Sequence, residues 1–341
     1  MSLRSARRFV SAFAVAIVFF ATIPSPAAST GVADDQLNGL QWRLVGPFRG
    51  GWGTMAVGIP DQPGTFYFSA AGGGVWKTTN SGATWQPTSE GITDAAIGAI
   101  AIAPSNPKVL YAGAGHPEPR YDIASGNGVY KTSDGGERWQ NAGLKATRHI
   151  GAILIDPRDE KTVLVGALGH IFGPSPDRGV FRTTDGGATW KKTLFIDNQT
   201  GVADLAADPV RPNIVFASAW TARNWPWLSY FTPIEGEGSA IYASQDGGET
   251  WKRLSGEGWP QGKLGRIGLA VTHLKNDATR IYASIDSEEH GGLYRSDDAG
   301  AHWQRVNDAK AVTTWYESRL TVAPNDPDTL YTVGQSIHKS T

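Results

Sequence analysis

The pattern Ser/Thr-x-Asp-x-Gly-x-x-Trp occurs five times in the 341 residues, once with Asn in place of Asp, and this repetition limits the fold more than any other feature. Successive copies begin 54, 51, 61 and 52 residues apart. That period is typical of a four-stranded propeller blade with its loops and is too long for a leucine-rich or ankyrin unit. The copies are TTNSGATW at 78–85, TSDGGERW at 132–139, TTDGGATW at 183–190, SQDGGETW at 244–251 and SDDAGAHW at 296–303.

Each copy belongs to a longer repeated unit. A short strand with an aromatic or aliphatic centre precedes each copy, as in GVWKT, GVYKT and GVFRT. Further upstream, two apolar strands enclose a turn rich in Pro, Asn and Asp, which is typical of a β-hairpin. Because a four-stranded meander cannot bury both of its faces alone, the sequence predicts an all-β propeller of packed four-stranded antiparallel blades. The hairpins lie at 97–115, 150–169, 202–220, 267–285 and 318–335.

Both ends of the repeated region hold partial units. Residues 41–47, QWRLVGP, resemble the fourth strand of a blade without its motif, and 318–341 supply only the first three strands of a sixth blade. Thr341 stands where the next motif would begin. We therefore expect a propeller domain at 41–341 with five blades and a partial sixth, as a fragment of a larger propeller. The alternative is a six-bladed propeller in which 41–47 completes the last blade.

The motif itself is expected to be structural. Its paired glycines supply the positive φ angles of a tight hairpin. The Asp and Ser/Thr side chains can accept hydrogen bonds from loop amides, and the Trp can pack beneath the turn. A feature present in every blade serves the scaffold, so no catalytic role is predicted for it. The residues concerned are Asn80, Trp85, Asp134, Trp139, Asp185, Trp190, Asp246, Trp251, Asp298 and Trp303.

The N-terminal residues have the composition of an export signal. Three arginines precede an apolar run of 14 residues and a small-residue segment, so we expect a signal peptide at 1–28, a linker at 29–40 and a periplasmic or extracellular protein. The run is shorter than the ~20 apolar residues of a membrane-spanning helix, so no transmembrane segment is expected in the mature chain. The absence of cysteine excludes thiol chemistry, and the net charge of −1 gives no basic field for nucleic acid.

The blocks QWRLVGPFRGG, GGGVWKTTNSGATW and GGLYRSDDAGAHW resemble the secreted bacterial Asp-box (bacterial neuraminidase repeat) propellers with a sortilin-like N-terminal region. The resemblance covers about residues 40–341. It implies an exported propeller, and many members of this group carry glycosyl-hydrolase or sialidase-like labels because of the repeat. The chain departs from the group at Trp52, where an arginine is common, and at His116, where a glutamate is common.

Loop topology places the candidate site on one face of the propeller. In a meander blade, the loops between the second and third strands share a face with the loops between successive blades, and function concentrates in such long, non-repeating loops. These loops are rich in Arg, His and Trp. The candidate ligand-binding residues are Arg49, His116, Glu118, Arg120, Arg148, His149, His170, Arg223, Trp225, Trp227, Arg266 and Tyr316.

Two functions remain open for this face. The first is a binding or scaffold module that recognises a protein, peptide or glycan. The alternative is a glycoside hydrolase, sialidase-like or another exo-glycosidase, that acts in the same central funnel. A hydrolase needs two carboxyl groups roughly 5–10 Å apart, and no spacing in the loops singles out such a pair. No cofactor is predicted, and no metal site, because the loop histidines lie in different blades.

Overall fold

The computed structural model describes residues 51–118, 123–223, 234–308, 319–333 and 336–341. The signal peptide and linker predicted at 1–40, and the strand predicted at 41–47, lie outside these residues. The described residues belong to one compact unit, 49–341. They contain no helix long and apolar enough to cross a membrane.

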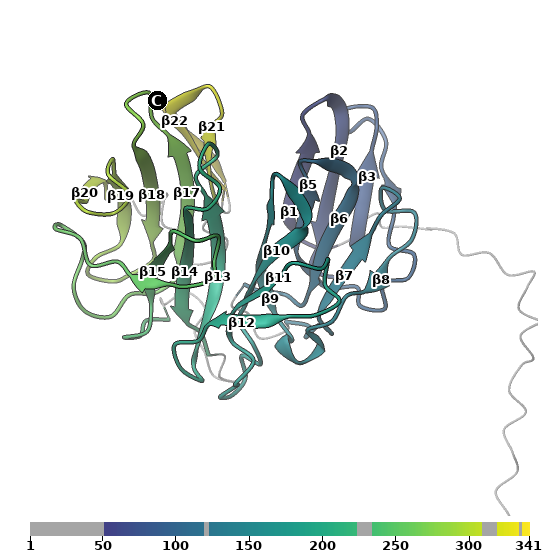
Figure 1. The fold of residues 1–341 in the computed structure, drawn as a ribbon, viewed down its shortest axis with the longest axis horizontal. Coiled ribbons are helices and arrows are strands. Elements are labelled where there is room, and N and C mark those ends of the chain that lie inside the picture. The colour runs from purple at the N-terminus through teal and green to yellow at the C-terminus, as the bar shows by residue number, and fades with distance from the viewer. Residues whose placement is uncertain (1–50, 119–122, 224–233, 309–318, 334–335) are drawn as a thin grey trace, which may run out of the picture. The chain divides into compact units, whose positions relative to one another are not determined.

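The described residues form six antiparallel sheets, five of four strands and a sixth of three strands. Figure 1 shows the sheets following one another along the chain. Within each sheet the strands are adjacent in chain order, as in a meander. The prediction of an all-β propeller is therefore confirmed, with three strands described in the sixth blade.

The first three blades have the following strands. Blade 1 comprises β1 (Gly53–Ile59), β2 (Gln62–Ala70), β3 (Gly74–Thr78) and β4 (Gln86–Pro87). Blade 2 comprises β5 (Ile97–Ala103), β6 (Asn106–Ala114), β7 (Val129–Thr132) and β8 (Gln140–Asn141). Blade 3 comprises β9 (Ile150–Asp156), β10 (Asp159–Ala167), β11 (Gly179–Thr183) and β12 (Lys191–Leu194).

The remaining blades follow the same plan. Blade 4 comprises β13 (Thr200–Ala207), β14 (Val215–Thr221), β15 (Ala240–Ser244) and β16 (Lys252–Arg253). Blade 5 comprises β17 (Ile267–His273), β18 (Thr279–Ile285), β19 (Gly292–Ser296) and β20 (Gln304–Asn307). Blade 6 comprises β21 (Arg319–Ala323), β22 (Asp326–Val333) and β23 (Ile337–Ser340). A short 3-10 helix, η1 (Lys145–Thr147), connects blades 2 and 3.

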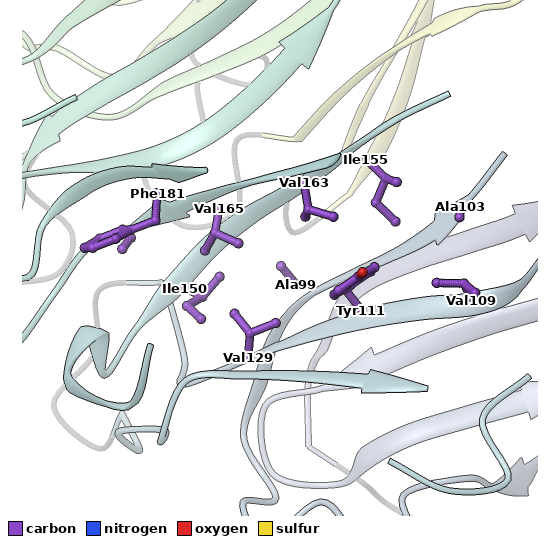
Figure 2. Close-up of a cluster of buried hydrophobic side chains, with 11 residues drawn as sticks. Ala99, Ala103, Val109, Tyr111, Val129, Ile150, Ile155, Val163, Val165 and Phe181 are labelled. Carbon is purple, nitrogen blue, oxygen red and sulfur yellow. The ribbon is translucent and has the colours of Figure 1, made fainter. Parts of the chain in front are cut away.

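The first strands of successive blades pack side by side, and the hydrophobic core lies between the blades. Figure 2 shows the core between blades 2 and 3, where Tyr111 and Val129 face Ile150, Val163 and Phe181. Each large apolar side chain buried in this way contributes roughly 1.5–3 kcal/mol. Gly151 permits the close approach of β9 and β13, because a Cβ at this position would lie 2.6 Å from the Ala203 carbonyl oxygen.

The Asp box has the same local hydrogen bonds in each blade that contains it. In blade 2, the Thr132 hydroxyl donates to Asp134 Oδ1 at 2.6 Å and accepts from the Gly136 amide at 3.1 Å. Asp134 Oδ1 also accepts from the amide of Arg138. Gly135 and Gly136 have φ angles of 78° and 94°, which L side chains rarely adopt. The motif is thus a closed hairpin turn whose aspartate is occupied by backbone donors.

The Asp boxes of blades 2 and 3 also join each of these blades to the blade before it. The Trp139 indole nitrogen donates to the Thr88 carbonyl of blade 1 at 2.8 Å, and the Trp190 indole donates to the Ala142 carbonyl of blade 2 at 2.7 Å. In return, the Tyr67 hydroxyl of blade 1 donates to the Gly135 carbonyl of the box at 2.8 Å. The motif, interpreted from the sequence as a local turn, is therefore also an interblade joint.

Candidate functional site

Charged side chains from several blades meet where second strands end and first strands begin. Glu118 follows β6, Asp286 follows β18 and Arg266 precedes β17, while Asp204 lies in β13 and Arg319 opens β21. This is the face on which loop topology placed the candidate site. Burying charges is costly unless they are paired, so the contacts among these groups determine their protonation states.

Glu118 is the ionised carboxyl group of the cluster. Its Oε2 lies 3.0 Å from His116 Nε2, and its Oε1 lies 3.9 Å from an Arg266 guanidinium nitrogen. Burial by itself would raise the pKa of Glu118, but His116 and Arg266 more than offset that effect and the pKa is lowered. The Trp52 ring stacks on His116, with ring centroids 5.6 Å apart. Glu118 therefore holds a negative charge while buried.

Asp286 is shifted in the opposite direction. Burial raises its pKa to about 7; the charge of Arg266 opposes this shift and that of Glu235 adds to it. The Asp286 amide donates to the Arg266 carbonyl and the Asp286 carbonyl accepts from the Gly265 amide, each at 2.9 Å. These bonds fix Asp286 beside Arg266, whose guanidinium lies 5.7 Å from the centre of the Trp220 ring. Asp286 thus holds a proton over much of the range below pH 7.

The charge of Arg266 acts on both Glu118 and Asp286, and their pKa values are shifted in opposite directions. Two carboxyl groups whose surroundings separate their pKa values are the usual sign of an acid and a base with distinct roles. Below about pH 7, where Asp286 keeps its proton and can donate it, the lowered pKa of Glu118 leaves a carboxylate that can accept a proton or attack. The arrangement can therefore support general acid–base chemistry.

Asp204 and Arg319 form a second, partly buried pair at this centre, and each side chain is 15% exposed. Their side chains lie 3.8 Å apart, and Arg319 also donates to the Gly151 carbonyl at 3.2 Å. Burial raises the pKa of Asp204, although its carboxylate accepts from the Leu205 and Leu269 amides. The strand registers show that Asp204 and Arg319 occupy the same position in the first strands of their blades. In the other four blades this position is occupied by Met55, Ala99, Ala152 and Gly268.

His149 supports the cluster as a neutral side chain. Burial lowers its pKa to about 4, so it is uncharged at neutral pH. Its Nδ1 lies 2.9 Å from the His116 carbonyl oxygen and its Nε2 lies 3.2 Å from the Ser125 hydroxyl. A neutral imidazole donates from only one nitrogen, and the carbonyl requires that the proton be on Nδ1. His149 therefore holds the loop that carries His116 and Glu118.

The structure brings together four of the predicted site residues. His116, Glu118, His149 and Arg266 are buried in this cluster. Arg148 and His170 are exposed, and Arg223 is partly buried. Arg178, another arginine of the same loops, is buried and donates to the Ala222, His170 and Gly173 carbonyls, so it braces the loops. The other predicted residues lie outside the described residues: Arg49, Arg120, Trp225, Trp227 and Tyr316.

The site prediction missed Asp204 and Asp286. The signal for Asp204 was available, because an aspartate interrupts an apolar first strand at a position where the other blades have a small or apolar residue, or Arg319. Asp286 gave no comparable signal, because it opens a loop that contains other acidic residues. Among the described residues, no group of three His, Cys, Asp or Glu side chains has the arrangement of a metal site.

Comparisons with known proteins connect the chain to glycan-degrading enzymes. The BNR/Asp-box repeat family matches residues 242–253. Xyloglucanase Xgh74A of Acetivibrio thermocellus is 24% identical over 291 residues, covering 78% of this chain and 33% of the enzyme. A xyloglucanase of Hypocrea jecorina is 24% identical over 325 residues, covering 86% and 35%. The chain thus spans about a third of the length of these curated relatives.

Solved structures give the same fold. The GH74 xyloglucanase of Xanthomonas campestris aligns with a TM-score of 0.59 at 17% identity, over 84% of this chain and 44% of that enzyme. At this identity the likeness concerns the fold alone. Taken together, the sequence relatives favour the glycoside hydrolase alternative over the binding module that was the leading interpretation of the sequence.

Proposed function

We propose that this protein is a glycoside hydrolase acting on polysaccharides, with its reacting groups in the cluster around Arg266. The observation that supports the proposal most strongly is the pair of carboxyl groups, Glu118 and Asp286, with pKa values shifted in opposite directions beside one arginine. The sequence relatives point to the same class of reaction, since both are xyloglucanases. Export, predicted from the N-terminal residues, would bring such an enzyme to polysaccharide outside the cell.

The proposed roles follow from the protonation states. Asp286, protonated below about pH 7, donates its proton to the oxygen of the glycosidic bond as that bond breaks. Glu118, a carboxylate, accepts a proton from the attacking water or bonds directly to the sugar carbon. Arg266 holds the Glu118 carboxylate and limits the rise in the pKa of Asp286. His116 and His149 position Glu118 without exchanging protons with the substrate.

The substrate class is proposed from the relatives. Both named relatives are xyloglucanases, so a branched glucan is the first substrate to test. The chain spans about a third of the length of each relative, so the activity of the whole protein is part of this proposal.

The proposal is tested by assaying the purified chain against xyloglucan, other soluble glucans and aryl-glycosides, with release of reducing ends as the readout. We expect Glu118→Gln and Asp286→Asn each to lower the rate by at least about 100-fold, the usual scale of acid–base catalysis. Glu289→Gln removes an exposed carboxylate and is the matched control. Folded protein that releases no product from any substrate, or whose activity survives both substitutions, would overturn the proposal. Glycan binding without cleavage would favour the binding module instead.

A further inference from the structure

Tyrosine recurs at one register position of the second strand. The position pairs with the penultimate residue of the third strand, and its side chain faces the next blade. It is occupied by Tyr67 in blade 1, Tyr111 in blade 2 and Tyr282 in blade 5, and these three side chains are buried. Figure 2 shows Tyr111 in the core between blades 2 and 3. The tyrosine ring thus fills space between two blades.

The hydroxyl of each of these tyrosines donates to a backbone carbonyl of the next blade. Tyr111 donates to the Glu160 carbonyl at 3.0 Å, and Tyr282 donates to the Pro327 carbonyl at 2.9 Å. Both acceptors lie at the start of the next second strand. Tyr67 donates instead to the Gly135 carbonyl of the next Asp box. The position therefore joins a ring-shaped space to a carbonyl acceptor.

Blade 3 has Leu164 at this position, whereas blade 4 keeps a ring in Phe216. Leu164 packs on the next Asp box, since a Cβ on Gly248 would lie 2.7 Å from a Leu164 methyl carbon. A leucine side chain is shorter than a tyrosine side chain and has no hydroxyl. A pocket of about 280 Å³ lies between blades 3 and 4, bordered mainly by Leu154, Leu164, Ala207, Pro209, Pro212 and Val215.

The pocket contains the acceptor that a tyrosine would meet. The first glycine of the blade-3 box donates to the Lys161 carbonyl, and that of the blade-4 box donates to the Asn213 carbonyl. These bonds fix the register of the two turns, so Pro212 is the equivalent of Glu160. No described residue donates a hydrogen bond to the Pro212 carbonyl. The carbonyl of the blade-4 box glycine, in contrast, already accepts from Arg182 Nε at 3.1 Å.

The charged residues that line the pocket are both acidic, Asp156 and Asp208. The hydrogen bond from Arg158 lowers the pKa of Asp156. Burial by itself would raise the pKa of Asp208, but hydrogen bonds from Thr279 and His273 lower it to about 2. Both groups are therefore carboxylates at neutral pH. They disfavour an anion in the pocket and leave a neutral ring that carries a donor as the complementary ligand.

We propose that the pocket between blades 3 and 4 binds a small para-substituted phenol. Its ring lies against Leu164 and Val215, and its hydroxyl donates to the Pro212 carbonyl as Tyr111 donates to Glu160. The volume is at the lower end of the range of small-molecule pockets and fits one ring with a short substituent. The site is separate from the cluster around Arg266, because it lies where second strands begin rather than where they end.

The binding test uses p-cresol, with toluene and p-toluate as matched probes that lack the donor or carry a negative charge. Each is titrated into the 341-residue chain while the Val215 methyl signals are followed by ¹H–¹³C NMR, with Val215→Ile to assign them. We expect p-cresol to bind about 3–10-fold more tightly than toluene, the effect of one net hydrogen bond. p-Toluate should bind at least about tenfold more weakly than p-cresol. Equal affinities for p-cresol and toluene, or no saturable shift with p-cresol, would overturn the proposal.

Two substitutions fill the pocket from different walls. Leu164→Tyr places the ring of the other blades in the chain itself, so it should abolish p-cresol binding and raise the melting temperature by about 2–4 °C. Ala207→Leu extends an aliphatic side chain from β13 without adding a ring or a donor, and it should weaken p-cresol binding at least about tenfold. Binding of p-cresol that either variant leaves unchanged would place the ligand elsewhere. A lower melting temperature in Leu164→Tyr would show that the pocket does not fit a phenol, and the proposal would be wrong.

Discussion

At the scale of single residues, the pKa values of two buried carboxyl groups are shifted in opposite directions because their neighbours differ. Glu118 lies between His116 and Arg266, and these neighbours lower its pKa despite its burial. Asp286 has Arg266 on one side and the negative charge of Glu235 nearby, and burial raises its pKa to about 7. The environments alone thus distinguish a base from an acid. Loop topology could predict which loops converge, but it could not predict these neighbours.

The pH dependence of hydrolysis follows from the raised pKa of Asp286. Its acid form is present below about pH 7 and is lost as the pH rises through that value, so kcat/KM should fall about tenfold per unit above it. Glu235→Gln removes a charge that raises this pKa and can still accept from the Glu288 amide. We therefore expect Glu235→Gln to move the alkaline limb of the pH profile to lower pH. A limb that stays in place would exclude Asp286 as the acid.

His149 makes the stability of the protein depend on pH. Its pKa is about 4 in the folded protein and 6.5 without burial, so the unfolded chain binds the proton more tightly. Stability is therefore complete above about pH 6.5 and declines as the pH falls toward 4, by about 3 kcal/mol for this residue. Urea unfolding at pH 7 and pH 4 should show a smaller decline in His149→Asn than in the wild type. Equal declines in the two proteins would contradict this assignment.

At the scale of elements, the strands and turns could be predicted from the sequence, whereas the joints between blades could not. The period of the Asp box and the apolar hairpins before it predict four strands per blade, and five of the six described sheets have four. The bonds of Tyr67 and Trp139 to neighbouring blades depend on how two sheets are placed, and residue spacing within one blade carries no information about that placement. Only the comparison of equivalent positions across blades reveals these bonds.

The interblade hydrogen bond of an Asp-box tryptophan should contribute measurably to the free energy of unfolding. Trp190→Phe keeps an aromatic ring but removes the donor to the Ala142 carbonyl, so we expect the free energy of unfolding to fall by about 1–3 kcal/mol. Trp85→Phe is the matched control, because Trp85 donates to no described residue. Denaturant titrations of both variants give the comparison. Similar losses of stability in the two variants would show that the Asp-box tryptophan stabilises the fold through the packing of its ring rather than through this hydrogen bond.

At the scale of the whole molecule, the candidate site exists only when several blades are assembled. Glu118, Asp204, Arg266 and Arg319 come from blades 2, 4, 5 and 6. Four residues of this buried cluster had been named from the meander topology, since it places the long loops on one face. It could not separate buried from exposed members of one loop: Arg148 at φ 58° ends η1 and is exposed, while the adjacent His149 is buried.

The Asp204–Arg319 pair couples the blades across this centre. Arg319→Met leaves the partly buried Asp204 carboxyl without this partner and also removes the hydrogen bond to the Gly151 carbonyl of blade 3. We expect a loss of about 1–3 kcal/mol in the free energy of unfolding, less than for a fully buried pair because both side chains are partly exposed. Adding Asp204→Asn should recover part of the loss, because the amide oxygen still accepts from the Leu269 amide while the charge is gone. Strictly additive losses in the double variant would contradict the coupling.

The central claim is that Asp286 holds a proton near neutral pH while Glu118 is ionised, with Arg266 acting on both carboxyl groups. It is tested most directly by measuring the pKa of the Asp286 carboxyl by ¹³C NMR on protein labelled at the aspartate carboxyl carbon, with Asp286→Asn to assign the signal. We expect a midpoint of about 7 in the wild type, and a lower midpoint in Glu235→Gln. A midpoint near the ordinary aspartate value of about 3.9 would mean that the site lacks a proton donor at neutral pH, and the proposed chemistry would be wrong.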